Sequence, residues 1–148
     1  MSKKSSYFLD TSVFVAAFWG DHPQHLASVR LVKSATPKTA ACAAHTVAEV
    51  YSTMTRLPVK PPVPPEQALL FIRQIRDQFT VVSLDDTDHF ETVERLAARG
   101  VARSYIYDGL IMTAAAKSGA ATIYTWDVDD FQLVSPDEIA QTSEGCPR

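Results

Sequence analysis

Short apolar runs alternate with longer segments of helical periodicity along most of the chain. The apolar runs predict strands at residues 7–9, 39–44, 79–83 and 122–126. Apolar residues spaced three or four positions apart predict helices at residues 13–19, 22–34, 47–54, 66–76, 86–99 and 106–118. Strands that alternate with helices in this way predict an α/β domain with a mostly parallel sheet.

Local signals mark the ends of several of these elements. Thr11 or Ser12 is available to cap the first helix, and Pro65 suits the first position of the fourth. Gly119 follows the last helix, where a glycine commonly ends a helix. The proline-rich stretch 58–65 cannot form regular structure, so we expect an extended connector there.

Length, charge and cysteine usage narrow the class of protein. The 148 residues suit one domain, which we assign to residues 1–138, followed by a flexible C-terminal tail at 139–148. The net charge of −3 argues against binding nucleic acid through bulk positive charge, but it allows a local basic rim. Cys42 and Cys146 match neither a zinc site nor a disulfide framework, which favours a reducing cytoplasm. No apolar run approaches the roughly 20 residues that cross a bilayer, and no signal peptide is recognisable.

Four acidic residues stand where apolar segments end: Asp10, Glu49, Asp108 and Asp127. Asp10 and Asp127 each follow a predicted strand, and the carboxyl ends of parallel strands meet at one edge of a sheet. Asp108 lies in the first turn of a helix that is apolar almost all round, where a buried carboxylate needs a partner. Carboxylates can converge when Mg²⁺ or Mn²⁺ neutralises them. We therefore interpret the four residues as a shared metal site for phosphodiester chemistry.

Simpler interpretations exist for several of these residues. Asp10 could serve only as a helix cap, and Asp127 only as a turn residue. Glu49 lies off the apolar face of its helix, where a solvated glutamate is the default. We expect the hydroxyl of Ser12 to hydrogen-bond a ligating carboxylate or a phosphate. The four histidines lack metal-ligand spacing, which predicts surface or capping roles for His22, His25, His45 and His89.

Four segments, taken in order, resemble the PIN-domain ribonucleases, and among them the VapC-type toxins of prokaryotic toxin–antitoxin pairs. The segments are residues 8–12, 48–50, 107–116 and 124–131. The resemblance implies a three-layer α/β/α sandwich with a central parallel sheet. It also implies Mg²⁺- or Mn²⁺-dependent cleavage of RNA, inhibition by a small antitoxin protein, and homodimerisation.

The resemblance also assigns roles to individual residues. The acidic positions of the metal and catalytic site are Asp10, Glu49, Asp108 and Asp127, with Thr11 or Ser12 as the adjacent hydroxyl. The segment after the fourth position often carries basic residues in this family, whereas Asp129 and Asp130 stand here. Whether Asp127 or one of these two neighbours completes the site stays open at this point.

We therefore predict an endoribonuclease, a hydrolase of phosphodiester bonds. Asp10 and Asp108 would bind the metal directly, while Glu49 and Asp127 would complete its shell through waters or bind a second ion. Hydrolysis by metal-activated water would leave 5′-phosphate and 3′-hydroxyl ends. Basic residues on helix surfaces would position the RNA backbone, and the candidates are Arg56, Lys60, Arg99 and Arg103.

Apolar residues close to Asp10 predict the partner surface. We expect a groove for an amphipathic antitoxin helix, followed by an arginine that enters the acidic pocket. The residues that would line this groove are Val13, Phe14, Phe18 and Trp19.

Other classes of α/β protein also place aspartates at strand ends. A phospho-receiver module and a catalytically silent binding domain are the alternatives that we keep. A haloacid-dehalogenase-like phosphatase fits poorly, because Ser12 occupies the position where that class carries its second aspartate.

Overall fold

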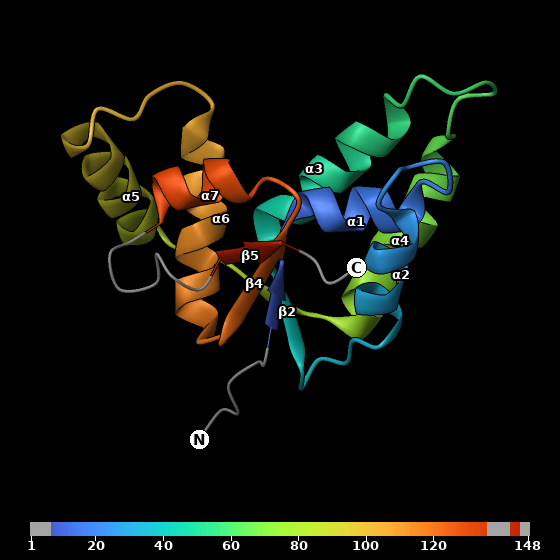
Figure 1. Cartoon of the computed structure of the whole chain (residues 1–148), viewed down its shortest axis with the longest axis horizontal. Coiled ribbons are helices and arrows are strands. Elements are labelled where there is room, and N and C mark those ends of the chain that lie inside the picture. Colours follow the sequence, from blue (N-terminus) through green and yellow to red (C-terminus); the bar gives the residue numbers. More distant parts are fainter. Residues whose placement is uncertain (1–6, 136–142, 146–148) are drawn as a thin grey trace.

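The computed structural model of the protein describes residues 7–135 and 143–145, and within these ranges strands and helices alternate (Figure 1). The strands are β1 (Tyr7–Leu9), β2 (Ala40–Ala43), β3 (Thr80–Val82), β4 (Thr122–Thr125) and β5 (Ser143–Gly145). The helices are α1 (Thr11–Phe18), α2 (His25–Lys33), α3 (Ala44–Thr55), α4 (Pro65–Gln78), α5 (Asp86–Ala98), α6 (Tyr105–Ser118) and α7 (Val128–Val134).

The five strands form one parallel sheet in the order β3-β2-β1-β4-β5. β1 lies in the centre and pairs with β2 on one side and β4 on the other. The strand order reverses between β1 and β4, and ligands of open α/β sheets bind outside the carboxyl ends of strands at such a switch point. Receiver domains of the flavodoxin-like class have the order 2-1-3-4-5, so this topology excludes the phospho-receiver alternative.

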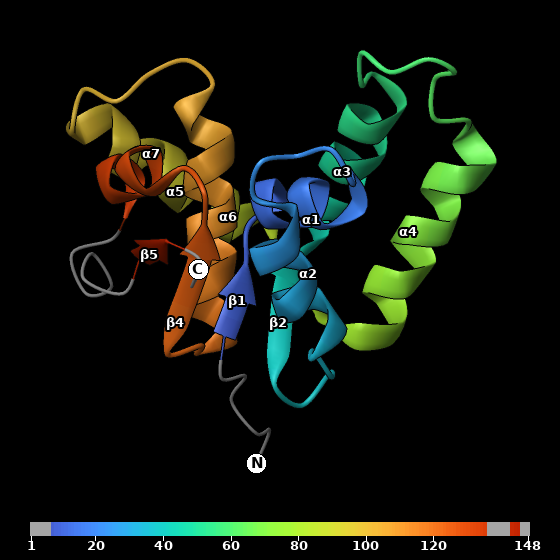
Figure 2. The ribbon, with the colours of Figure 1, turned by 45° about the vertical axis from the view of Figure 1, so that its right-hand side comes forward.

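Alternate side chains of the central strands form two separate cores. Leu9 and Cys42 pack with α1 to α4, whereas Phe8 and Ala41 pack with α5 to α7. Figures 1 and 2 show these two groups of helices on opposite faces of the sheet. The predicted three-layer α/β/α sandwich with a parallel sheet is therefore confirmed.

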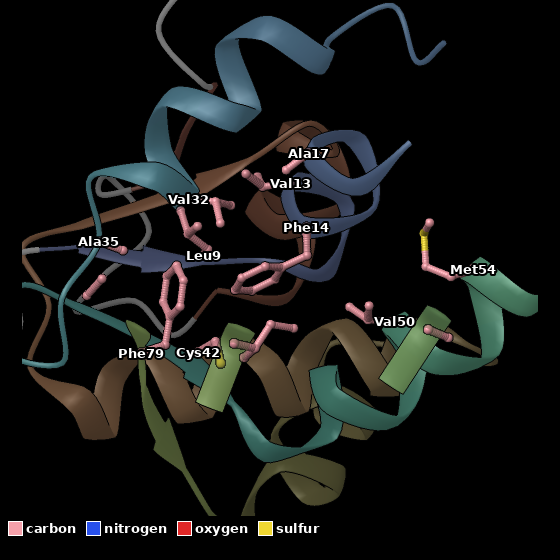
Figure 3. Close-up of a cluster of buried hydrophobic side chains, with 13 residues drawn as sticks. Leu9, Val13, Phe14, Ala17, Val32, Ala35, Cys42, Val50, Met54 and Phe79 are labelled. Atoms are coloured by element: carbon pink, nitrogen blue, oxygen red, sulfur yellow. The ribbon is translucent and has the colours of Figure 1, made fainter. Parts of the chain in front are cut away.

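The first of these cores fixes α1, the helix that follows the central strand β1. Phe14 is fully buried, and Figure 3 shows it pointing toward Phe79, which lies where α4 runs into β3. The two rings meet edge to face, with centroids 4.9 Å apart and planes at 73°. Such aromatic pairs contribute roughly 0.5–1.5 kcal/mol beyond their buried area, so α1 is anchored firmly against the sheet.

Two predicted helix ends are confirmed, at Pro65 and Gly119. Pro65 occupies the first turn of α4. α5 begins with a capping box. In that box Asp85 accepts the Asp88 N–H at 2.8 Å, while Asp88 accepts the Asp85 N–H at 3.0 Å. Gly119 ends α6 with a φ of 72°, a left-handed conformation that glycine adopts at little cost.

One predicted cap is wrong. α1 begins at Thr11, and its N-cap is Asp10 rather than Thr11 or Ser12. Asp10 accepts the backbone N–H of Ser12 at 3.3 Å, in the way that an aspartate normally caps a helix. The capping role does not remove Asp10 from the predicted site, because only one of its carboxylate oxygens takes part.

Two elements were not predicted from the sequence. α7 follows β4 directly and buries Phe131 and Val134 against α6 and the sheet. β5 pairs with β4 and comes from the segment expected to be a tail; the other residues of 139–148 lie outside the described ranges. Cys42 is a buried free thiol, and Cys146 falls outside those ranges as well. Within the described part of the chain, no helix is both long and apolar enough to cross a membrane.

Candidate active site

The four predicted acidic residues line one cavity of about 260 Å³ at the carboxyl edge of the sheet. Asp10 follows β1, and Asp127 follows β4 at the switch point of the strand order. Glu49 comes from α3, and Asp108 from the first turn of α6. The full lining consists of Asp10, Thr11, Ser12, Val15, His22, Glu49, Thr53, Asp108 and Asp127.

Asp10 is the most buried of these carboxylates, with 3% of its surface exposed. Its Oδ2 accepts hydrogen bonds from the hydroxyls of Ser12, at 2.7 Å, and Thr125, at 2.9 Å. Burial raises the pKa of Asp10 to about 6, because the two hydroxyls offset only part of the desolvation. Among the described residues nothing donates to Oδ1, so that oxygen is the one left for a ligand.

Asp108 is the carboxylate whose pKa is affected by the largest number of neighbouring acidic side chains. Burial, followed by the neighbouring carboxylates, raises the pKa of Asp108 to about 7. In order of effect these carboxylates are Asp10, Asp130, Glu49 and Asp127. Because four of these carboxylates are on or beside one cavity, a bound cation would relieve their mutual repulsion.

The environment of Asp108 differs from the prediction in one respect. We expected a helix that is apolar and buried almost all round, but α6 exposes Tyr107 and Lys117, and Asp108 itself is only half-buried. Its carboxylate therefore remains accessible from the cavity, which a fully buried aspartate would not be.

Glu49 is held in place rather than freely solvated. Thr11 donates a hydrogen bond from its hydroxyl to Oε1 of Glu49 at 3.0 Å, and His45 Nε2 lies 3.6 Å from the same oxygen. The Thr11 hydroxyl also lies 3.0 Å from that of the buried Thr46. The two hydroxyls predicted beside Asp10 thus have separate partners, since Thr11 contacts Glu49 whereas Ser12 contacts Asp10.

Of the three aspartates in the acidic stretch after β4, only one lines the cavity. Asp127 lines the cavity, and burial together with the charge of Asp130 raises its pKa. Asp130 lies one turn further along α7 and also acts on Asp108. Asp129 is exposed and does not line this cavity. The geometry therefore favours Asp127, with Asp130 as its neighbour, over Asp129.

Sequence reasoning missed two residues of the site. Thr125 contacts Asp10, but the two are separated by 115 positions, so no local pattern marks the pair. His22 was expected at the surface or in a cap, yet it lines the acidic cavity. The capping expectation fits His25, whose Nδ1 lies 2.9 Å from the carbonyl of Ala16 near the end of α1.

The donor set fits a divalent cation. Carboxylate oxygens are the ligands that Mg²⁺ and Mn²⁺ prefer, and Oδ1 of Asp10 is uncommitted. In residues 7–135 and 143–145 no three His, Cys, Asp or Glu side chains already form a closed ion-binding group. A cation would therefore have to draw the carboxylates together, and their mutual repulsion is what its charge would relieve.

The apolar groove predicted beside Asp10 has a different lining from the one expected. Val13 and Phe14 are fully buried in the core and cannot face a partner. Phe18 instead lines an apolar cavity of about 420 Å³ and stacks on Phe71 of α4, with ring centroids 4.6 Å apart. The remaining lining residues are Ala17, Val29, Val32, Lys33 and Gln74.

One of the basic residues expected to contact RNA has another role in this structure. Arg99 donates a hydrogen bond to the carbonyl of Ser135 at the end of α7, at 2.5 Å, and Arg95 likewise donates to the carbonyl of Val134, at 2.7 Å. These arginines tie α5 to α7, so Arg99 helps to hold the helix that carries Asp130.

The family model of the PIN domain matches residues 7–135 of the chain. No curated protein sequence matches it. Among solved structures, the chain is similar to Mycobacterium tuberculosis VapC20, described as a toxin that cleaves the sarcin-ricin loop. The identity is 19% and the TM-score 0.73, over 96% of this chain and 100% of that one.

Two further solved structures share the fold. VapBC2 from Rickettsia felis, bound to a DNA fragment from their promoter, is 18% identical with a TM-score of 0.64, over 95% of this chain and 98% of that one. FitAcB from Neisseria gonorrhoeae is 17% identical with a TM-score of 0.55, over 86% and 92%. Identities this low establish the likeness of the fold alone.

Proposed function

The chain belongs to the PIN-domain family, and on that premise we propose that it is a metal-dependent endoribonuclease, the toxin of a toxin–antitoxin pair. The observation that carries the proposal is the convergence of four carboxylates from four elements on one cavity. Carboxylates that converge in this way repel one another, which lowers the stability of the fold. A divalent cation bound among them would relieve the repulsion and could also bind a phosphate.

The residues of the cavity have distinct roles in this proposal. Asp10, through Oδ1, and Asp108 would hold the metal, while Glu49 and Asp127 would complete its shell through waters or hold a second ion. When bound, the cation would make water more acidic and offset the charge that develops on the scissile phosphate. Products with 5′-phosphate and 3′-hydroxyl ends are expected from attack by water.

The hydroxyl groups keep these carboxylates in position. Ser12 and Thr125 both donate to Oδ2 of Asp10, which leaves Oδ1 for a ligand. Thr11 holds Glu49 toward α1. The carboxylates of Asp10 and Glu49 are thus held in place before a cation binds.

The substrate proposed is a structured RNA. The resemblance to PIN-domain ribonucleases supports this class, and VapC20, which shares the fold, is described as cleaving the sarcin-ricin loop. Because the chain has a net charge of −3, the attraction for RNA must come from the cation and from local donors rather than from the protein as a whole.

Incubation of the purified protein with a structured RNA tests the activity. We expect cleavage with Mg²⁺ or Mn²⁺, none with EDTA, and none of a DNA of the same sequence. Asp108→Asn should lose roughly 100-fold or more of the activity, because outer-shell changes alone cost about 10–100-fold.

Asp129→Asn is the matched control, since it removes an acidic charge near the site but outside its cavity. Full cleavage by a folded Asp108→Asn protein, or cleavage that continues in EDTA, would defeat the proposed function.

A small antitoxin is the proposed partner. α1 has the acidic cavity at its N-terminal end and the apolar cavity with Phe18 and Phe71 at its C-terminal end. Eight helical residues separate the two by about 12 Å. An amphipathic helix seated on the apolar cavity could therefore place an arginine among the carboxylates.

Co-expression with the neighbouring small reading frame tests this pairing. We expect the two proteins to co-purify and the toxicity to be relieved. Phe71→Asp should disrupt co-purification while leaving RNA cleavage intact. Failure of the wild-type proteins to co-purify would contradict the toxin role but not the nuclease activity. Size-exclusion chromatography tests the proposed homodimer separately.

A further inference from the structure

We propose that His22 is a neutral hydrogen-bond donor that positions a phosphate oxygen of the substrate through its Nε2–H. This inference rests on the proposed phosphodiester chemistry of the same cavity. His22 lines that cavity together with all four carboxylates. It lies in the turn between α1 and α2, outside the segments that carried the predicted site.

The structure fixes which ring nitrogen carries the proton. The backbone N–H of Gln24 donates a hydrogen bond to Nδ1 of His22 at 3.0 Å. Nδ1 must offer a lone pair to accept this bond, so the single proton of the neutral ring is on Nε2. Nε2 is therefore a donor, and it has no lone pair with which to bind a metal.

The orientation of the ring is also constrained. The backbone N–H of His22 donates to the carbonyl of Trp19 at 3.0 Å, and the backbone N–H of His25 donates to the carbonyl of His22 at the same distance. The indole of Trp19 packs edge-on against the imidazole, with centroids 5.7 Å apart and planes at 72°. These contacts hold the ring at the cavity, and among the described residues no side chain or carbonyl accepts from Nε2.

A neutral imidazole suits this cavity better than a protonated imidazole would. An imidazolium would carry a proton on Nδ1 as well, facing the N–H of Gln24, and it would pair with the carboxylates in place of a metal ion. Burial and the charge of His25 lower the pKa of His22, which keeps the ring neutral. A neutral N–H can bind a phosphate oxygen without cancelling the charge that holds a cation.

Few side chains of the cavity can donate a hydrogen bond to a phosphate oxygen. Of the side chains that line the cavity, His22 alone carries an N–H. The hydroxyls of Thr11 and Ser12 already donate to Glu49 and Asp10. The carboxylates of the cavity repel a phosphate. A hydrogen bond from His22 to a phosphate oxygen would offset part of this repulsion.

Three substitutions at His22 distinguish a role as hydrogen-bond donor to the substrate from a purely structural role. His22→Asn keeps an acceptor for the Gln24 N–H, and its amide N–H lies closer to the backbone than Nε2 of the imidazole does. His22→Asp keeps the acceptor but presents a carboxylate, and His22→Ala removes both. His89→Ala is the control, because this histidine contacts the carbonyl of Asp85 and does not line the cavity.

RNA binding with Ca²⁺, which takes the same oxygen ligands, RNA cleavage and Mn²⁺ affinity are measured for each variant. We expect His22→Ala to weaken RNA binding by roughly 10-fold, as loss of a hydrogen bond to a charged group does. His22→Asn should restore only part of the loss, because its N–H is further from the phosphate. His22→Asp should bind RNA worse than His22→Ala, and the Mn²⁺ affinity should not fall in His22→Ala.

¹⁵N NMR of the imidazole in the wild-type protein tests the tautomer without any activity. A protonated Nδ1, RNA binding by His22→Ala at the wild-type level, or a lower Mn²⁺ affinity in His22→Ala would each overturn the inference. The proposed function would survive these results as long as the wild type cleaves RNA. A wild type that cleaves no RNA with either metal would instead defeat the proposed function, and the role of His22 with it.

Discussion

Thr125 donates a hydrogen bond of 2.9 Å to Oδ2 of Asp10 and joins the ends of β4 and β1 across 115 residues of sequence. Both side chains are buried. The same hydroxyl oxygen accepts the backbone N–H of Asp127 at 2.9 Å. One threonine therefore holds the carboxylate of Asp10 and the backbone of Asp127.

Thr125→Val should impair the site while keeping the shape of the side chain. The change removes a donor that lowers the pKa of Asp10, so that pKa should rise further. We expect a loss of about 10–100-fold in RNA cleavage and of about 1–3 kcal/mol in the free energy of unfolding. Thr125→Ser keeps the hydroxyl and should retain most of both. Equal cleavage by the valine and serine variants would show that the hydroxyl does not matter.

Without metal, the stability of the fold should fall as the pH rises from about 4 to about 7. Folding raises the pKa of Asp10 from 3.8 to about 6 and that of Asp108 to about 7. In this window the folded state holds protons that the unfolded chain has released, so the free energy of unfolding decreases as those protons leave.

For the buried Asp10, the difference in pKa between the unfolded and the folded state corresponds to about 3 kcal/mol in the free energy of unfolding. Asp108 is half-exposed, and solvent screening makes its contribution smaller. Urea unfolding at several pH values in EDTA measures the effect, and Asp10→Asn should flatten the curve. A wild type whose stability rises over the same window would contradict the assigned pKa shifts.

Mg²⁺ or Mn²⁺ should raise the melting temperature at pH 7.5, because a ligand that binds only the folded state stabilises it. A concentration 100-fold above the Kd gives about 2.7 kcal/mol, which for a chain of this length is roughly 5–10 °C. The rise should shrink in Asp10→Asn. KCl at matched ionic strength is the control for screening, and an equal rise with KCl would argue against a specific cation site.

Gly109→Ala should destabilise the fold next to Asp108. A Cβ at this position would lie 2.7 Å from Cδ1 of the buried Leu96 and 3.3 Å from Cγ2 of Thr92, both on α5. Overpacking costs about 1–3 kcal/mol, while alanine in a helix gains up to about 1 kcal/mol. We expect a net loss of about 1 kcal/mol by urea unfolding. Gly20→Ala, where a Cβ meets open space, is the control and should change stability less.

The sequence was sufficient to predict the layers of the fold and the acidic residues of the cavity. Apolar runs and helical spacing identified β1 to β4 and α1 to α6. Asp10 and Asp127 were predicted to meet because both follow parallel strands, and they line the same cavity. Their roles in catalysis stay predictions.

The parts that were not predicted have physical reasons. α7 is short and begins with an acidic turn, so Phe131 and Val134 gave too little periodicity to mark it. β5 contains only Ser, Glu and Gly and has no apolar pattern. The contact of Thr125 with Asp10 depends on which strands become neighbours, and strand order cannot be read from local pattern.

The central position of β1 also determines when the cavity can form during translation. β1 is the first of the described strands to leave the ribosome, but one of its two neighbours, β4, is made only after α6. Until then Asp10 has neither Thr125 nor Asp127 beside it. A nascent chain therefore lacks the complete cavity until β4 has been made, and under the proposed function it would leave its own messenger intact while it is being translated.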